Sequence, residues 1–121
     1  MNPDKASLNE KFALIREHWR PKVAAQLNGQ ELKLVKFAGA FPWHHHENED
    51  EMFLVVQGRM RMRFRDHEEI VKPGEFIIVP KGVEHLPVAE IETQVLLFEP
   101  KTTLNTGNVS NERTLPQLER I

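Results

Sequence analysis

The sequence contains no cysteine and no tyrosine, and its serines lie near the two ends of the chain, at Ser7 and Ser110. The missing cysteine excludes disulfide bonds, thiolate nucleophiles and cysteine zinc sites. The missing tyrosine and the position of the serines leave histidine, acidic residues, lysine or a metal ion to carry any chemistry.

Long apolar runs are also absent. The longest run, residues 52–56, is far shorter than the roughly 20 residues of a membrane helix. The 16 basic and 18 acidic residues nearly balance, so we expect neither a nucleic acid nor a membrane as a partner. The N-terminal residues are polar and lead into no apolar signal core, which predicts a cytoplasmic protein. A length of 121 residues predicts a single domain over residues 1–121.

A helix is predicted over residues 7–20. A Ser-x-x-Glu capping box opens it, and Pro21 ends it. Its apolar residues recur at spacings of four, three and four and therefore share one face: Leu8, Phe12, Ile15 and Trp19. We expect this face to pack over an end or an edge of the main domain.

The middle of the chain, residues 22–100, is predicted to form strands only. Asn28-Gly29 marks a hairpin, because both turn positions need a positive φ. The strands expected between this and later turns are residues 23–27, 31–37, 52–57, 60–65, 69–72, 76–79, 85–89 and 93–98. Short strands at near-regular spacing indicate an all-β sandwich or closed barrel, and the lack of helical crossovers disfavours a parallel α/β sheet.

Two further segments have plainer interpretations. Four arginines alternate with apolar residues over residues 59–65, which predicts an outer strand face paired with acids such as Glu68, Glu69 and Glu75. A nucleic-acid-binding stripe is the less favoured alternative, because no aromatic residue interleaves that face.

Residues 101–121 are expected to form an irregular or partly extended tail that wraps this domain or a neighbour.

A histidine cluster is the most informative stretch. On an extended strand His44 and His46 point to one side and His45 to the other, and such a pair suits a divalent metal. Glu51 would be out of phase on an unbroken strand, but the polar residues 47–50 are expected to bend and reset the register. Glu51 is then the candidate third ligand. A solvated polar loop is the alternative.

A second segment, residues 74–85, ends in another histidine. An apolar strand and a Pro-x-Gly turn precede His85. We take His85 as a candidate fourth ligand delivered by a neighbouring strand. A capping histidine bonded to the backbone is the alternative.

Together the two segments resemble the motifs of the cupin superfamily. The first motif stands here as Gly39-x4-His44-x-His46-x4-Glu51-x6-Gly58, one residue short in its first gap. The second stands as Gly74-x5-Pro80-x-Gly82-x2-His85, with Ala89 where the family has an Asn that binds no metal. The chain is also similar to the small single-domain cupins named after mannose-6-phosphate isomerase, on the evidence of Glu99-Pro100 followed by Asn105-Thr106-Gly107.

This resemblance implies a jelly-roll barrel, or double-stranded β-helix, of antiparallel strands with a metal ion inside. It assigns the ligands as His44, His46, Glu51 and His85. Such a donor set accepts one divalent transition metal ion, whether Fe, Mn, Ni, Zn, Co or Cu. The resemblance also points to a homodimer, as do open sheet edges.

Three imidazoles and one carboxylate leave positions open on a five- or six-coordinate ion, which is typical of a catalytic site. We therefore expect a metal-dependent enzyme for a small-molecule ligand, with oxygenase, isomerase and lyase chemistry all open and the catalytic residues unassigned. The pocket walls are expected to be apolar: Phe53, Val55, Phe76, Ile78, Val95 and Leu97. The alternatives are a non-catalytic, metal-containing module that binds or senses a small molecule, and an accessory domain with a vestigial site.

Overall fold

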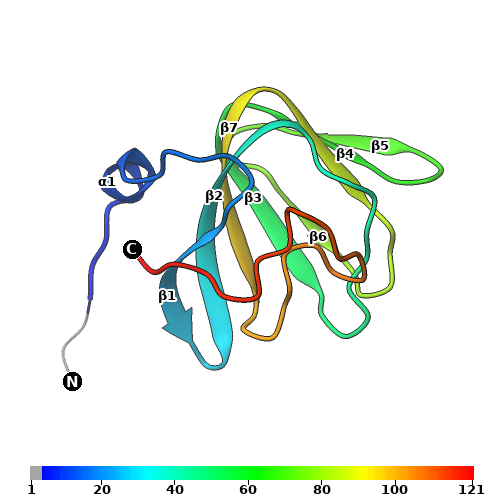
Figure 1. Cartoon of the computed structure of the whole chain (residues 1–121). Coiled ribbons are helices and arrows are strands. Elements are labelled where there is room, and N and C mark those ends of the chain that lie inside the picture. Colours follow the sequence, from blue (N-terminus) through cyan, green and yellow to red (C-terminus); the bar gives the residue numbers. More distant parts are fainter. Residues whose placement is uncertain (1–3) are drawn as a thin grey trace.

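The computed structural model describes residues 4–121, and Figure 1 shows the path of the chain. One helix, α1, spans Leu8–Ala13. The strands are β1 (Lys22–Leu27), β2 (Gln30–Ala40), β3 (Glu51–Gln57), β4 (Met60–Arg63), β5 (Glu68–Val71), β6 (Phe76–Val79) and β7 (Leu86–Pro100). Among residues 4–121, no helix has the length and hydropathy needed to cross a bilayer.

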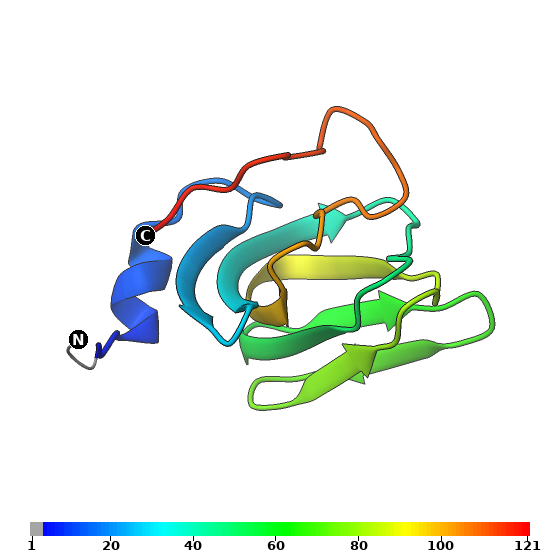
Figure 2. The ribbon, with the colours of Figure 1, turned by 90° about the horizontal axis from the view of Figure 1, so that it is seen from below.

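All strand pairs are antiparallel, and the path of neighbours runs β1-β2-β7-β3-β6. Strand β7 is shared between two groups: its start pairs with β4, which also carries β5, and its end pairs with β3. The expected all-β jelly-roll is confirmed, with one difference. Because β5 and β6 do not pair with each other, the described strands curve around a common interior without closing into a barrel (Figure 2).

The last two predicted strands are one long strand. Residues 85–89 and 93–98 were expected to be separate, but β7 runs unbroken through Glu90-Ile91-Glu92. These three residues are exposed and contain no Gly or Pro that would end a strand. The register with β2 shifts between Phe37 and Gly39, which lets β7 bend there.

The helix prediction over residues 7–20 was too long. Ser7 caps α1 by accepting a hydrogen bond from the backbone N–H of Glu10, but the helix ends at Ala13. Trp19 has a φ of 61°, which no right-handed helix permits. Its indole stacks on Phe37 and donates a hydrogen bond to a backbone oxygen of β2. A short helix is only weakly stable by itself. The packing of Trp19 on β2 therefore outweighs the tendency of this segment to stay helical.

Alternation along the strands sets which side chains face the interior. The buried side chains include Val35 and Phe37 of β2, and Phe53 and Val55 of β3. Strand β7 adds Val95 and Leu97 to the same core.

Two predicted pocket walls are wrong. Phe76 and Ile78 are 59% and 55% exposed. Strand β6 is paired so that Ile77 lies opposite Phe53, and Val79 lies opposite Glu51. Residues opposite each other point to the same face, so the interior takes Ile77 and Val79 and the solvent takes the other two.

The arginine-rich strand β4 carries its charges on the outside. Arg61 and Arg63 both pair with Glu68 across the β4–β5 hairpin, as expected. Arg61 also contacts Glu90 of β7. The acids Glu69 and Glu75, which were also named as partners, pair elsewhere: Glu69 with His67, and Glu75 with the backbone N–H of Lys72.

The C-terminal tail wraps its own domain. Asn108 accepts a hydrogen bond from the His45 backbone N–H and returns one from its own N–H to the His45 oxygen. Gly107 lies so close to His45 that an added Cβ would stand 2.2 Å from its backbone oxygen. Farther along, Arg120 bridges β1 at Val23. The tail is therefore fixed to the segment that carries the histidine cluster.

Candidate metal centre

Backbone hydrogen bonds bring the two histidine segments together. His44 and His85, far apart in the sequence, form an antiparallel bridge in which each N–H donates to the other's oxygen, at 3.1 and 2.9 Å. The His46 oxygen accepts a hydrogen bond from Gly82, and the Asp50 carboxylate accepts one from Lys81. The loop of the second segment is thus fastened to both ends of the first.

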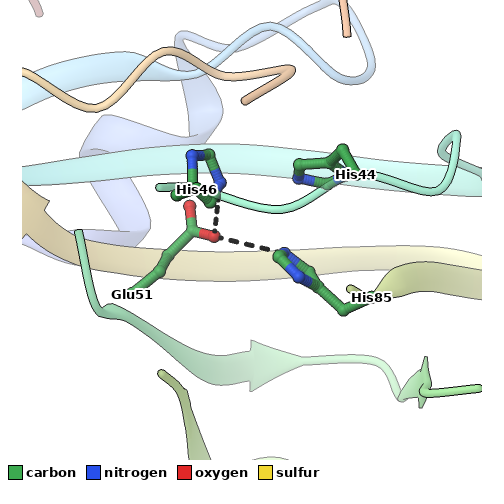
Figure 3. A group of neighbouring side chains, drawn as sticks. All are labelled: His44, His46, Glu51 and His85. Carbon is green, nitrogen blue, oxygen red and sulfur yellow. Dashed lines mark ion pairs between the residues drawn. The ribbon is translucent and has the colours of Figure 1, made fainter. Parts of the chain in front are cut away.

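The four candidate ligands converge on one point. His44, His46, Glu51 and His85 each offer one ligand atom, and these atoms all lie within 4.8 Å of one another. Figure 3 shows the four side chains grouped together, with dashed lines from the Glu51 carboxylate to the rings of His46 and His85. All four are buried, with exposures between 0% and 4%. The four residues named as candidate ligands in the sequence therefore lie together in the structure.

The bend that brings Glu51 into place lies at residues 47–50, as expected. These residues form no strand, and β3 begins at Glu51 itself. The first carboxylate of the strand therefore faces inward in phase with Phe53 and Val55. His45 points away from the group and pairs with Glu47.

Three atoms at the centre of the group lack hydrogen-bond partners. His46 Nε2 and His85 Nε2 lie 3.2 and 3.5 Å from Glu51 Oε1, yet none of the three atoms makes a hydrogen bond of good geometry. Buried polar atoms are normally satisfied, so three unsatisfied ones around a common point need a further partner. A cation at that point would satisfy all three, and the donor set therefore fits a divalent transition metal.

Two of the three imidazoles are oriented by backbone contacts. Nδ1 of His44 contacts the Pro42 oxygen at 2.9 Å, and Nδ1 of His85 contacts the Val83 oxygen at 2.9 Å. A carbonyl only accepts, so each Nδ1 carries the hydrogen and donates. Each Nε2 is then left with a lone pair directed at the centre, which is the arrangement expected of metal-binding histidines.

The ionisation of the site also suits a cation. Burial, reinforced by the neighbouring His85 ring, lowers the pKa of His44 to about 4, so this imidazole is neutral at pH 7. Burial acts to raise the pKa of Glu51, but the neighbouring Glu99, His46 and His85 side chains outweigh burial and hold that pKa well below the usual range. Neutral imidazole and ionised carboxylate are the forms that bind metals.

Two buried charges beside the site were not predicted. Lys33 of β2 and Glu99 of β7 are 1% and 2% exposed and lie 2.8 Å apart, Nζ to Oε1. Burial, followed by the charge of Glu51, raises the pKa of Glu99 well above its usual range. The sequence does contain a pattern that indicates their burial. Each residue lies two positions from an apolar residue of its own strand, at Lys33-x-Val35 and Leu97-x-Glu99, and so faces the same side.

A small cavity adjoins the ligands. It has a volume of about 30 Å³ and is bordered by His44 and Glu51. Its other walls are Trp19, Pro21, Lys33, Val35, Phe37, Phe41, Phe53, Pro87, Leu97, Glu99 and Asn105. The walls are mainly apolar, as expected, but of the six predicted residues only Phe53 and Leu97 border the cavity. A cavity of this size holds little more than a water molecule. A larger ligand needs the covering segments around Trp19 or Asn105 to move.

Comparison with known proteins agrees with this geometry. The family model described as the Cupin domain matches residues 32–99, which include all four clustered residues. The chain belongs to the cupin family. Its open jelly-roll is thus a cupin fold with the expected residues at its centre.

The chain is similar to several known proteins. A cupin-2 domain containing protein from Shewanella frigidimarina has a crystal structure with a TM-score of 0.78 and 42% sequence identity, covering 79% of this chain and 94% of that one. The uncharacterized protein YdbB of Bacillus subtilis is 32% identical over 78 residues, which is 64% of this chain and 69% of YdbB. Auxin-binding protein ABP19b of Prunus persica is 28% identical over 99 residues, 72% of this chain and 47% of that protein. The narrower grouping with mannose-6-phosphate isomerase-like cupins stays a prediction.

Proposed function

We propose that this cupin is a metal-dependent enzyme acting on a small molecule, with one divalent transition metal ion held by His44, His46, Glu51 and His85. The observation that carries the proposal is the set of three buried ligand atoms without hydrogen-bond partners around one point. Two further features support it: the neutral state of His44 at pH 7, and the backbone contacts that turn the Nε2 atoms of His44 and His85 to the centre.

A bound ion of this kind would act as a Lewis acid or a template for substrate oxygens. The chain itself supplies a mainly apolar surrounding, because aromatic side chains border the cavity, and a carboxylate beside it. Oxygenation, isomerisation and elimination are the reaction types that we propose to test. The predicted location of the activity stays the cytoplasm, and we treat residues 1–121 as one domain.

Metal analysis tests the proposal. Protein purified without added metal, or reloaded after chelation, is expected to contain about one transition metal ion per chain. Inductively coupled plasma mass spectrometry measures this content. Dioxygen uptake and product formation across a panel of thiols, diols and β-diketones then test for turnover. Reloaded protein that retains no ion after desalting would contradict the proposal.

A binding module is the second candidate function. It is favoured by the relative from Prunus persica, whose name describes an auxin-binding protein. The same metal-loaded protein distinguishes the two functions. Tight binding of a small molecule with no turnover supports the module, whereas product formation supports the enzyme.

We also propose that two copies of the chain form a homodimer through the outer face of β3 and β6. Exposed Phe76 and Ile78 pair with Leu54 and Met52 on neighbouring strands, so four apolar side chains share one outward face. The face carries no charge and ends at the free edge of β6, and an uncharged face can pack against a second copy of itself about a two-fold axis.

The dimer is tested by light scattering on the purified protein. The wild-type mass is expected to be twice the chain mass of 14.1 kDa. A Phe76→Lys, Ile78→Glu double variant is expected to be monomeric. Ile91→Lys is the matched control, since Ile91 is 61% exposed but lies on the bend of β7. A wild-type protein of monomer mass, or a dimer unaffected by the double variant, would contradict the proposal.

A further inference from the structure

The buried pair of Lys33 and Glu99 needs a reason beyond the stability of the fold. Both side chains are almost fully buried, at 1% and 2% exposure. Burying two such groups costs free energy because both must be taken out of water, and replacing a buried pair by apolar residues of similar volume is often neutral or stabilising. A fold of this kind therefore does not require the pair for packing alone.

Strand register places the pair directly beside the metal centre. Strands β3 and β7 pair Met52 with Phe98, so the next position along each strand sets Glu51 beside Glu99 on the inner face. Lys33 belongs to β2, the other neighbour of β7. The three side chains together border the small cavity. They therefore form a row across β2, β7 and β3 in which Lys33 stands diagonally from Glu99, because β2 pairs Glu31 with Glu99 and Lys33 with Leu97.

Glu99 is the middle member of this row. One of its carboxyl oxygens, Oε1, accepts a hydrogen bond from Lys33 at 2.8 Å. The other, Oε2, is buried, and no N–H or O–H donor of another residue reaches it. Glu51 is the cross-strand neighbour of Glu99 on the inner face, and both carboxyl groups border the cavity. Two neighbouring carboxyl groups can bond to each other only with one hydrogen between them.

Lys33 is itself fixed from several directions. Its Nζ donates to the Thr103 backbone oxygen at 3.4 Å and lies 3.8 Å from Glu31 Oε1. Thr103 belongs to the start of the C-terminal tail. The contacts from β2, β7 and the tail leave the ammonium group little freedom, so it can hold a neighbouring carboxyl in one orientation.

We propose that Lys33 and Glu99 are positioning residues for the metal: Lys33 orients the Glu99 carboxyl, and Glu99 orients the Glu51 carboxylate so that Oε1 faces the ion. This inference rests on the proposed metal site. Neither residue contacts the ion, and the effect is transmitted by hydrogen bonds alone. Outer partners of metal ligands usually change metal affinity by about 10- to 100-fold.

Titration with Co²⁺ tests the proposal on the full chain, because the visible spectrum of this ion reports its coordination. Glu99→Leu and Lys33→Met are each expected to weaken Co²⁺ binding about 10- to 100-fold and to alter the spectrum. Glu99→Gln is expected to bind nearly as the wild type does, since its amide donates to Glu51 and still accepts from Lys33.

Lys22→Met is the matched control. Lys22 is 4% exposed and pairs with Glu119 and Glu17, and none of these three residues borders the cavity beside the ligands. Its replacement is expected to leave Co²⁺ affinity unchanged. If a single variant fails to fold, the Lys33→Met, Glu99→Leu double variant removes both charges together, is expected to stay folded by circular dichroism and is expected to show the same weakened binding.

The outcomes separate this inference from the proposed function. A wild-type protein that binds no Co²⁺ refutes the metal site itself. A wild-type protein that binds Co²⁺, with folded Glu99→Leu of equal affinity and spectrum, refutes only the positioning role. A Glu99→Gln variant as weak as Glu99→Leu also refutes it, because the hydrogen bonds would then not be what matters.

Discussion

Replacing His85 by alanine is expected to abolish stoichiometric metal binding. His85 is fully buried, its Nε2 lies 3.5 Å from Glu51 Oε1, and its backbone bridges His44. Outer partners of a ligand change affinity by about 10- to 100-fold, so loss of a direct ligand should exceed about 100-fold. The metal content after desalting and the Kd from titration measure this effect.

His45→Ala is the control for this experiment, since His45 lies beside His44 in sequence but outside the ligand group. It should retain a full complement of metal. A second readout is thermal stability: metal at 100 times its Kd stabilises the wild type by about 2.7 kcal/mol, and this gain should vanish in His85→Ala. Equal metal content in wild type and His85→Ala would refute the assignment of this ligand. His85→Gln, which keeps much of the side-chain volume, separates lost coordination from lost packing.

Replacing Trp19 by alanine is expected to lower the free energy of unfolding by about 3–5 kcal/mol. The indole is 8% exposed, stacks on Phe37 and Phe41 with ring centroids 4.2 and 5.0 Å away, and donates from Nε1 to the Ala38 oxygen at 2.7 Å. Removing it leaves a cavity, which adjoins the metal centre, and frees the segment before β1. Chemical denaturation followed by circular dichroism measures the loss.

Leu14→Ala is the matched control, because Leu14 lies in the same segment but is 60% exposed. Its effect should stay within about 0.5 kcal/mol. Trp19→Phe should fall between the two, since it keeps ring stacking and loses the hydrogen bond. An unfolding free energy for Trp19→Ala within about 1 kcal/mol of the wild type would show that this segment does not pack on the core in solution.

Elements with strong local signals were predictable. The Asn28-Gly29 turn adopts positive φ at both residues, as the hairpin signal requires. The bend at residues 47–50 that resets the phase of Glu51 followed from its polar composition. Four ligand candidates could be named because strand alternation and turn spacing act over a few residues.

Phase was harder to predict where a strand is apolar throughout. Phe76-Ile77-Ile78-Val79 has no polar residue to mark the outer face, so alternation gives no preference between its two faces. Pairing with β3, whose Glu51 and Phe53 point inward, decides it. The helix was overextended for a similar reason: Trp19 fits a helical spacing, but a stacking partner on β2 holds it elsewhere.

By itself the sequence determined a strand-rich domain, its hairpin and four ligand candidates, because these depend on turn chemistry and on a two-residue period. The jelly-roll and the full ligand set followed from the resemblance of the two motifs to cupins. The tertiary structure alone decided that Lys33 and Glu99 meet beside Glu51, that Trp19 covers the cavity, and that Phe76 faces outward. Those contacts join residues that are far apart in the sequence, and no periodic pattern relates their positions. They depend on which strands pair and in which register, and that is fixed only when the whole sheet has formed.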